Sequence, residues 1–114
     1  MHVTIFHNPN CPQSRKALET IRARGIEPQI VEYLGKPLTP GQLRHLIKDE
    51  LHMPVRALVR DQEPCYTEMD LDQADDDTLL AAMAAHPSLM QRPIVVTDKG
   101  AKLCRSGEGV EGLL

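Results

Sequence analysis

The chain is short of aromatic residues, with no tryptophan, one phenylalanine (Phe6) and two tyrosines (Tyr33 and Tyr66) among its 114 residues. A hydrophobic core must therefore be built from aliphatic and methionine side chains. The length is sufficient for one ordinary core, and we predict a single domain over residues 1–114.

Other features that the sequence lacks exclude whole classes of protein. A net charge of −3 without any run of lysine or arginine argues against nucleic acid as the main partner. No apolar stretch approaches the roughly 18 residues of a membrane span, and the N-terminus has no signal-peptide pattern. Three widely spaced cysteines, Cys11, Cys65 and Cys104, match neither a disulfide framework nor a zinc site. We therefore expect no bound metal, no membrane partner and a reducing, cytoplasmic location.

The most informative stretch is residues 7–15, which contains Cys11. A short, partly β-branched apolar run at residues 3–6 precedes it and predicts a buried strand. Apolar residues at helical spacing follow it and predict a helix that ends at Gly25. Pro12 fits the first helical position, where its missing N–H group is no loss. We therefore expect Cys11 on a strand-to-helix turn.

This location gives Cys11 a candidate chemical role. The first turn of a helix offers unpaired N–H groups and the positive end of the helix dipole, and both favour anions. Such surroundings lower a cysteine pKa from ~8.5 to between ~3.5 and ~7.5. Arg15, one turn on, and His7 on the other side can add positive charge or hydrogen bonds. The hypothesis is that the Cys11 thiolate attacks a bound oxyanion; the alternative is a buried, inert cysteine.

The residues after Cys11 exclude two common kinds of cysteine site. A Cys-x-x-Cys redox pair would need a second thiol at position 14, where the chain has Ser14. A tyrosine-phosphatase-type loop needs a cysteine and an arginine six apart, whereas Cys11 and Arg15 are four apart. Any oxidation at Cys11 must therefore be resolved by a distant cysteine or by an outside thiol.

The remaining elements follow from apolar periodicity and helix-capping signals. We expect the following elements in chain order: a strand at 29–33, a helix from the capping box at 39–42 to before Pro54, a short helix at 55–60, an irregular segment at 61–74, a helix from Asp75 to His86, a strand at 94–97, a hairpin partner at 101–105 and a weak helix at 106–114. The acidic run at 75–77 is interpreted as a helix start and not as a metal site. The first strand, helix and strand form a βαβ unit with parallel strands.

Several short motifs recur along the chain in an order typical of one known family. They are His7-Asn8-Pro9-x-Cys11-x-x-Ser14-Arg15, Tyr33-Leu34, Arg56-Ala57-Leu58-x-Arg60, His86-Pro87, Arg92-Pro93-Ile94-Val95-Val96-Thr97 and Leu103-Cys104-Arg105. Together they resemble the ArsC family of glutaredoxin-dependent arsenate reductases. The resemblance implies an α/β, thioredoxin-like fold. Its four-stranded mixed sheet has the order 2-1-3-4 and is flanked by helices, with a helical insertion between strands 2 and 3.

The resemblance also implies roles for individual residues. Cys11 corresponds to the family's nucleophile, and His7 to a histidine thought to tune its thiolate. Arg60, Arg92 and Arg105 correspond to three arginines that bind the oxyanion and the arsenite product. Because a thiolate that approaches an arsenate dianion is repelled, several arginines are physically reasonable at such a site.

The residues that follow the nucleophile, Ser14 and Arg15, are predicted to face the same pocket; the alternative is that they only support the loop. Glutathione is the implied co-substrate and glutaredoxin the implied partner, with arsenate as the substrate and no bound cofactor. Cys104 is predicted to lie in the core, and a resolving role for Cys65 stays open.

Two alternative functions remain at this point. One is a regulator of the related Spx type, which binds RNA polymerase and senses oxidation. Such regulators usually sense through Cys-x-x-Cys and tend to lack the full arginine set, whereas this chain has Ser14 and all three arginines. The other is a glutathione-dependent thiol reductase that keeps Cys11 but acts on another substrate.

Overall fold

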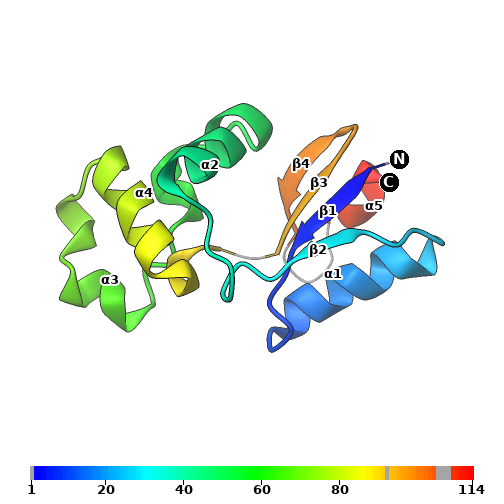
Figure 1. The fold of residues 1–114 in the computed structure, drawn as a ribbon, viewed down its shortest axis with the longest axis horizontal. Helices are drawn as coiled ribbons and strands as arrows, with labels where there is room; N and C mark the ends of the chain where they lie inside the picture. The colour runs from blue at the N-terminus through cyan, green and yellow to red at the C-terminus, as the bar shows by residue number, and fades with distance from the viewer. Residues whose placement is uncertain (1, 92, 105–108) are drawn as a thin grey trace. The chain divides into compact units, whose positions relative to one another are not determined.

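The structure of the protein, a computed structural model, describes residues 2–91, 93–104 and 109–114. The chain divides into two compact units, one formed by residues 1–36 with 92–114 and the other by residues 37–91. We call them the sheet unit and the helical unit, and Figure 1 shows the elements of each. The expectation that residues 1–114 form a single domain stays a prediction.

The sheet unit is built on four short strands. These are β1 (Val3–Phe6), β2 (Gln29–Val31), β3 (Ile94–Thr97) and β4 (Gly100–Leu103). Their order is β2-β1-β3-β4, with β1 parallel to β2 and antiparallel to β3, and with β3 antiparallel to β4. The predicted mixed sheet and its strand order are therefore confirmed, although β2 ends two residues earlier than expected.

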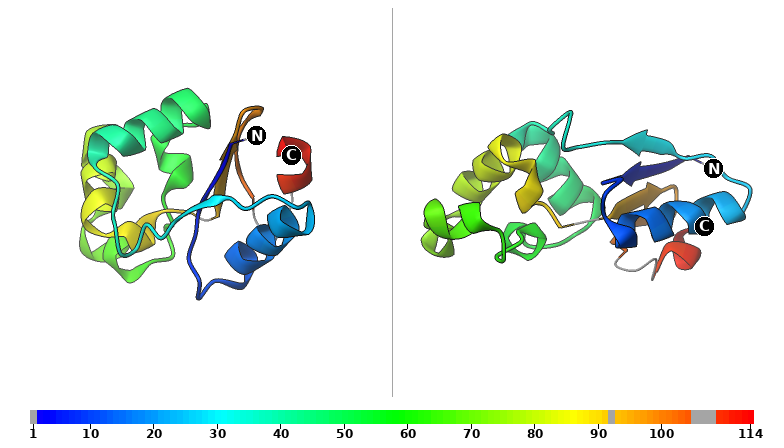
Figure 2. Two further views of the ribbon diagram at one scale, coloured as in Figure 1. Left: turned by 45° about the vertical axis from the view of Figure 1, so that its right-hand side comes forward. Right: turned by 90° about the horizontal axis from the view of Figure 1, so that it is seen from below.

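Two helices cover one face of this sheet, α1 (Pro12–Ala23) and the single turn α5 (Val110–Leu113) (Figure 2). They share one hydrophobic core with the sheet, which consists of Val3, Ile5, Ala17, Leu18, Ile21, Val95, Cys104, Val110 and Leu113. Alternate residues of β1 point into this core because side chains of a strand alternate between its two faces. The apolar positions that predicted the first helix are the ones that it buries.

The helical unit is the predicted insertion between strands 2 and 3. Its elements are α2 (Pro40–Arg44), a π-helical turn η1 (His45–Glu50), η2 (Val55–Leu58), α3 (Pro64–Glu68), η3 (Leu71–Gln73), α4 (Asp76–Ala85) and η4 (Pro87–Leu89). The capping box at Thr39 is present, with both of its hydrogen bonds to Gln42. Asp75 caps α4 by accepting a hydrogen bond from the Thr78 N–H at 2.8 Å, so this helix start is confirmed.

The expectation of an irregular segment at residues 61–74 is wrong, because α3 and η3 lie within it. Pro64 begins α3 at the first helical position, which is a favourable place for proline. The Arg56 guanidinium then donates to the carbonyl oxygens of Leu71 and Ala74 at 3.2 and 2.8 Å. Helices of five and three residues are too short to have a repeating pattern of apolar residues that could be recognised in the sequence. Tertiary contacts such as those of Arg56 stabilise them instead.

None of the helices in the described ranges is both long enough and apolar enough to cross a membrane.

Candidate active site

Cys11 is the N-cap residue of α1, directly before Pro12. Its N–H group donates to the carbonyl oxygen of Asn8 at 3.0 Å, which closes the turn after β1. Its carbonyl oxygen accepts from the Arg15 N–H at 3.0 Å, the first hydrogen bond of the helix. The residue is only 6% exposed. The predicted position on a strand-to-helix turn is confirmed, and it places the thiol beside the N-terminal end of a twelve-residue helix.

The loop that carries Cys11 is held by a buried hydrogen-bond network. His7 Nδ1 and Ser14 Oγ share a hydrogen bond of 2.6 Å, and the Asn8 N–H donates to the same hydroxyl at 3.0 Å. His7 is also tied to the sheet, because its N–H donates to the carbonyl oxygen of Val31 at 2.8 Å. His7 and Ser14 are both buried. The network joins the first turn of α1 to the end of β1 across the loop.

The surroundings of His7 favour the neutral form of its ring. Burial lowers the pKa of its imidazole below the usual value; the charge of Glu32 opposes this effect and that of Arg22 adds to it. A neutral imidazole has one donor and one acceptor nitrogen, and Ser14 engages Nδ1. Of the two contributions that the sequence suggested for His7, positive charge or hydrogen bonds, the geometry favours hydrogen bonding.

Ser14 and Arg15 lie in different surroundings although they are neighbours in sequence. Ser14 is fully buried, and its hydroxyl serves the loop through His7 and Asn8. Arg15 is exposed on the same helix. The structure therefore brings Ser14 and His7 together at the Cys11 loop, whereas the substrate contacts expected of Ser14 and Arg15 stay predictions. No motif in the sequence marked Ser14 as the hydrogen-bond partner of His7.

Arg60 is positioned by a pairing within the helical unit that sequence reasoning missed. Its N–H donates to the Leu89 carbonyl oxygen at 2.6 Å, and the Gln91 N–H donates to the Leu58 carbonyl oxygen at 2.8 Å. Val59 and Met90 form the antiparallel bridge between these two bonds. The pairing sets Arg60 beside a segment that ends at Gln91, one residue before Arg92 in sequence. Arg92 and Arg105, the other predicted oxyanion ligands, lie outside the described residues.

The guanidinium of Arg60 has a carboxylate partner. Arg60 Nη1 lies 3.3 Å from Glu63 Oε1, and the two side chains are 25% and 24% exposed. Arg56, which belongs to the same motif as Arg60, instead binds the helical unit itself through Tyr66, Leu71 and Ala74. The two arginines of one sequence motif therefore have different surroundings: Arg56 binds the backbone of the helical unit, whereas Arg60 lies beside the Glu63 carboxylate.

The other two cysteines differ in burial. Cys104 is fully buried, and burial raises the pKa of its thiol to about 11. Its predicted place in the core is confirmed. Cys65 is half-buried on α3, and the open question of a resolving role is untested.

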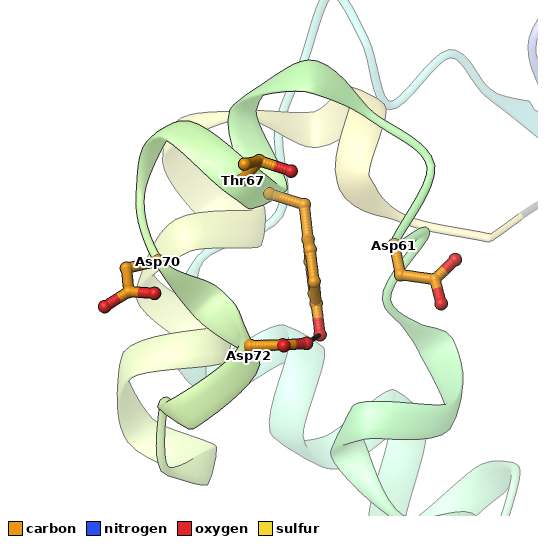
Figure 3. Close-up of a pocket in the computed structure, with 5 residues that line it drawn as sticks. Asp61, Thr67, Asp70 and Asp72 are labelled. Carbon is orange, nitrogen blue, oxygen red and sulfur yellow. Dashed lines mark hydrogen bonds between the residues drawn. The ribbon is translucent and has the colours of Figure 1, made fainter.

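A separate cavity of about 330 Å³ lies in the helical unit and is lined by Asp61, Tyr66, Thr67, Asp70 and Asp72. Figure 3 shows Asp61 and Asp70 on opposite sides of it. The Tyr66 hydroxyl donates to Asp72 at 2.9 Å, and this bond raises the pKa of the phenol. Three carboxylates give the cavity a negative lining, which is unsuited to an oxyanion.

Comparison with known proteins identifies close relatives. A model of the ArsC family matches residues 6–113. An arsenate reductase of Escherichia coli strain K12 is 46% identical over 115 residues, which cover 99% of this chain and 81% of the relative. One of Neisseria meningitidis is 37% identical over 98% of this chain and 97% of the relative. The structure is similar to that of an arsenate reductase from Vibrio cholerae, with a TM-score of 0.93 and 40% identity over 100% of this chain and 98% of that one. The predicted thioredoxin-like fold is thereby confirmed.

Proposed function

Because the chain belongs to the ArsC family, we propose that it reduces arsenate to arsenite, with Cys11 as the nucleophile and glutathione and glutaredoxin as reductants. The observation that carries this proposal is the position of Cys11 at the N-terminus of α1, on a loop fixed by the buried His7–Ser14 network. The site is proposed to work in the reducing cytoplasm, where a reactive thiol is maintained.

The first step is attack on arsenic. The Cys11 thiolate forms a sulfur–arsenic bond, and one arsenate oxygen leaves as water after protonation. The N–H groups of the first turn of α1 stabilise the thiolate before the attack. Arg60, Arg92 and Arg105 neutralise the charge of the oxyanion, which lowers the repulsion between two anions and stabilises the leaving oxygen.

The second stage uses outside thiols. The glutathione thiol displaces another oxygen, again released as water, and gives an adduct in which arsenic bridges Cys11 and glutathione. A thiol of glutaredoxin then attacks the glutathione sulfur, so that two electrons pass to arsenic and a glutathione–glutaredoxin disulfide forms. Hydrolysis of the Cys11–arsenic bond releases arsenite and restores the thiolate. Ser14 in place of a second cysteine fits this dependence on external thiols.

The buried network has a positioning role in this scheme. Ser14 holds the neutral ring of His7 through Nδ1 and also binds the Asn8 N–H, so that both sides of the loop are fixed before substrate arrives. A preorganised loop keeps the nucleophile in place during attack, which reduces the entropy lost in reaching the transition state.

The test is NADPH-coupled arsenate reduction with glutathione, glutathione reductase and glutaredoxin. Wild type should turn over only in the presence of glutaredoxin, and Cys11→Ser should have no activity. Cys65→Ser is the matched control, because Cys65 is a half-buried cysteine in the helical unit, and it should retain turnover.

Two outcomes would contradict the proposal. Turnover of a disulfide substrate, without any turnover of arsenate, would identify a glutathione-dependent thiol reductase. Binding to RNA polymerase that changes on oxidation, with no reductase activity, would identify a regulator of the Spx type.

A further inference from the structure

The ion pair between Arg60 and Glu63 lies within one tight turn of the backbone. The Glu63 N–H donates to the Arg60 carbonyl oxygen at 3.3 Å, so the backbone brings the two residues together three positions apart. The side chains then meet at 3.3 Å between Nη1 and Oε1. Since each side chain is about one quarter exposed, water screens this pair less than a fully exposed one.

Glu63 contacts Arg60 and does not cap its own helix. It is the N-cap residue of α3, but its side chain makes no capping hydrogen bond. A carboxylate at a helix N-terminus can satisfy the first N–H groups of the helix. Here the carboxylate contacts the Arg60 guanidinium instead.

We propose that Glu63 is an exchangeable counterion of Arg60, which an incoming oxyanion displaces and which binds Arg60 again when the product leaves. This inference rests on the proposed function, in which Arg60 is an oxyanion ligand. It assigns to Glu63 a role in setting the affinity for substrate and product.

Substrate and product differ in charge, and therefore in how well they compete with Glu63 for Arg60. A guanidinium has five N–H donors, and the contact with Glu63 engages Nη1. Arsenate as a dianion offers more charge and more acceptor oxygens than one carboxylate, so it can replace Glu63. Arsenous acid is uncharged at neutral pH and competes poorly with the carboxylate. Glu63 therefore weakens oxyanion binding and favours product release.

The experiment measures arsenate binding by calorimetry in the Cys11→Ser background, where turnover is absent. Glu63→Gln removes the negative charge at nearly constant size and should tighten arsenate binding roughly two- to fivefold, the range expected for a partly exposed ion pair. Asp61→Asn is the matched control, because it removes one exposed charge from the residue next to Arg60. It should change the affinity by much less.

A second variant guards against an effect of Glu63→Gln on folding. Glu63→Ser also removes the charge and supplies a good N-cap for α3, so the helix is preserved. Both variants should bind arsenate more tightly than the control. Unchanged or weaker binding in both would overturn the exchange role, and weaker binding would identify Glu63 as a residue that orients Arg60.

Failure of the inference can be separated from failure of the proposed function. If the protein with Cys11 intact reduces arsenate while neither Glu63 variant binds it more tightly, only the role of Glu63 is wrong. If the protein with Cys11 intact neither binds nor reduces arsenate, the proposed function fails and this inference fails with it.

Discussion

The loop of Cys11 in the sheet unit and the turn of Arg60 in the helical unit hold their polar side chains in different ways. In the first, His7 and Ser14 are buried and hydrogen-bonded to each other. In the second, Arg60 and Glu63 are about a quarter exposed and form one ion pair. Removing a partner from a buried network leaves an unsatisfied polar group, whereas removing a partner near the surface lets water replace it.

This difference suits the two tasks that the proposed mechanism requires. The nucleophile needs a fixed position before substrate arrives, and a buried network provides it. A substrate-binding cation needs to change partners during each cycle, and a partly exposed ion pair permits that exchange. Stability should therefore be sensitive to the first region and ligand affinity to the second.

The largest expected difference concerns thiol reactivity within the sheet unit. At neutral pH the Cys104 thiol, with its pKa raised to about 11, is almost wholly protonated. A Cys11 thiolate stabilised by the helix N-terminus should react with iodoacetamide on the order of 100-fold faster or more. Mass spectrometry of alkylated peptides over time measures both rates, with half-buried Cys65 as the internal reference. Equal rates for Cys11 and Cys104 would remove the case for an activated nucleophile.

Ser14→Ala should break the buried network. It leaves His7 Nδ1 and the Asn8 N–H without the hydroxyl that now binds them. His7 is buried, and an unsatisfied buried group costs about 1–3 kcal/mol, so the free energy of unfolding in urea should fall by about that much. Ser88→Ala in the helical unit is the control, because Ser88 is exposed and its replacement should change stability little. Similar losses in both variants would contradict the contrast between the two regions.

Arg56→Ala and Arg60→Ala should have different effects, although the two arginines belong to one motif: the first on stability and the second on arsenate binding. Arg56 donates to Tyr66 and to two carbonyl oxygens, so its loss should lower the free energy of unfolding by about 1–2 kcal/mol. Loss of Arg60 should cost less than about 1 kcal/mol, because its ion pair is partly exposed. Arg60→Ala should weaken arsenate binding instead. Urea denaturation of both variants measures the loss of stability, which should be larger for Arg56→Ala. Calorimetry measures arsenate affinity, which should fall more for Arg60→Ala.

The smallest expected effect is a dependence of stability on pH through His7. Burial lowers the pKa of His7 in the folded protein, so the unfolded chain binds more protons between the folded value and the unfolded value of ~6.5. The contribution of neutral His7 is therefore complete above ~6.5 and is lost as the pH falls through the folded pKa. Unfolding free energies at several pH values should have a shallower slope for His7→Asn than for wild type. His2→Asn, at an exposed position, should keep the wild-type slope.

Much of the local structure could be predicted from the sequence because the signals act between near neighbours. Pro12 after Cys11, the capping box at Thr39 and the acidic cap at Asp75 each concern hydrogen bonds within one helical turn. Short apolar runs likewise predicted β1 and β3, since a buried strand needs little else. The segment at 61–74 was wrong, because its short helices depend on contacts with Arg56, which is distant in sequence.

The sequence by itself therefore determined the order of the strands and of the main helices, the fold class and the position of Cys11 at a helix N-terminus. Tertiary structure alone decided that the Ser14 hydroxyl binds His7, that residues 58–60 pair with residues 89–91, and that Glu63 turns to Arg60 instead of capping its own helix. The physical reason is that a polar side chain has several possible partners of similar strength. Only the packed chain fixes which of them lies within hydrogen-bond distance.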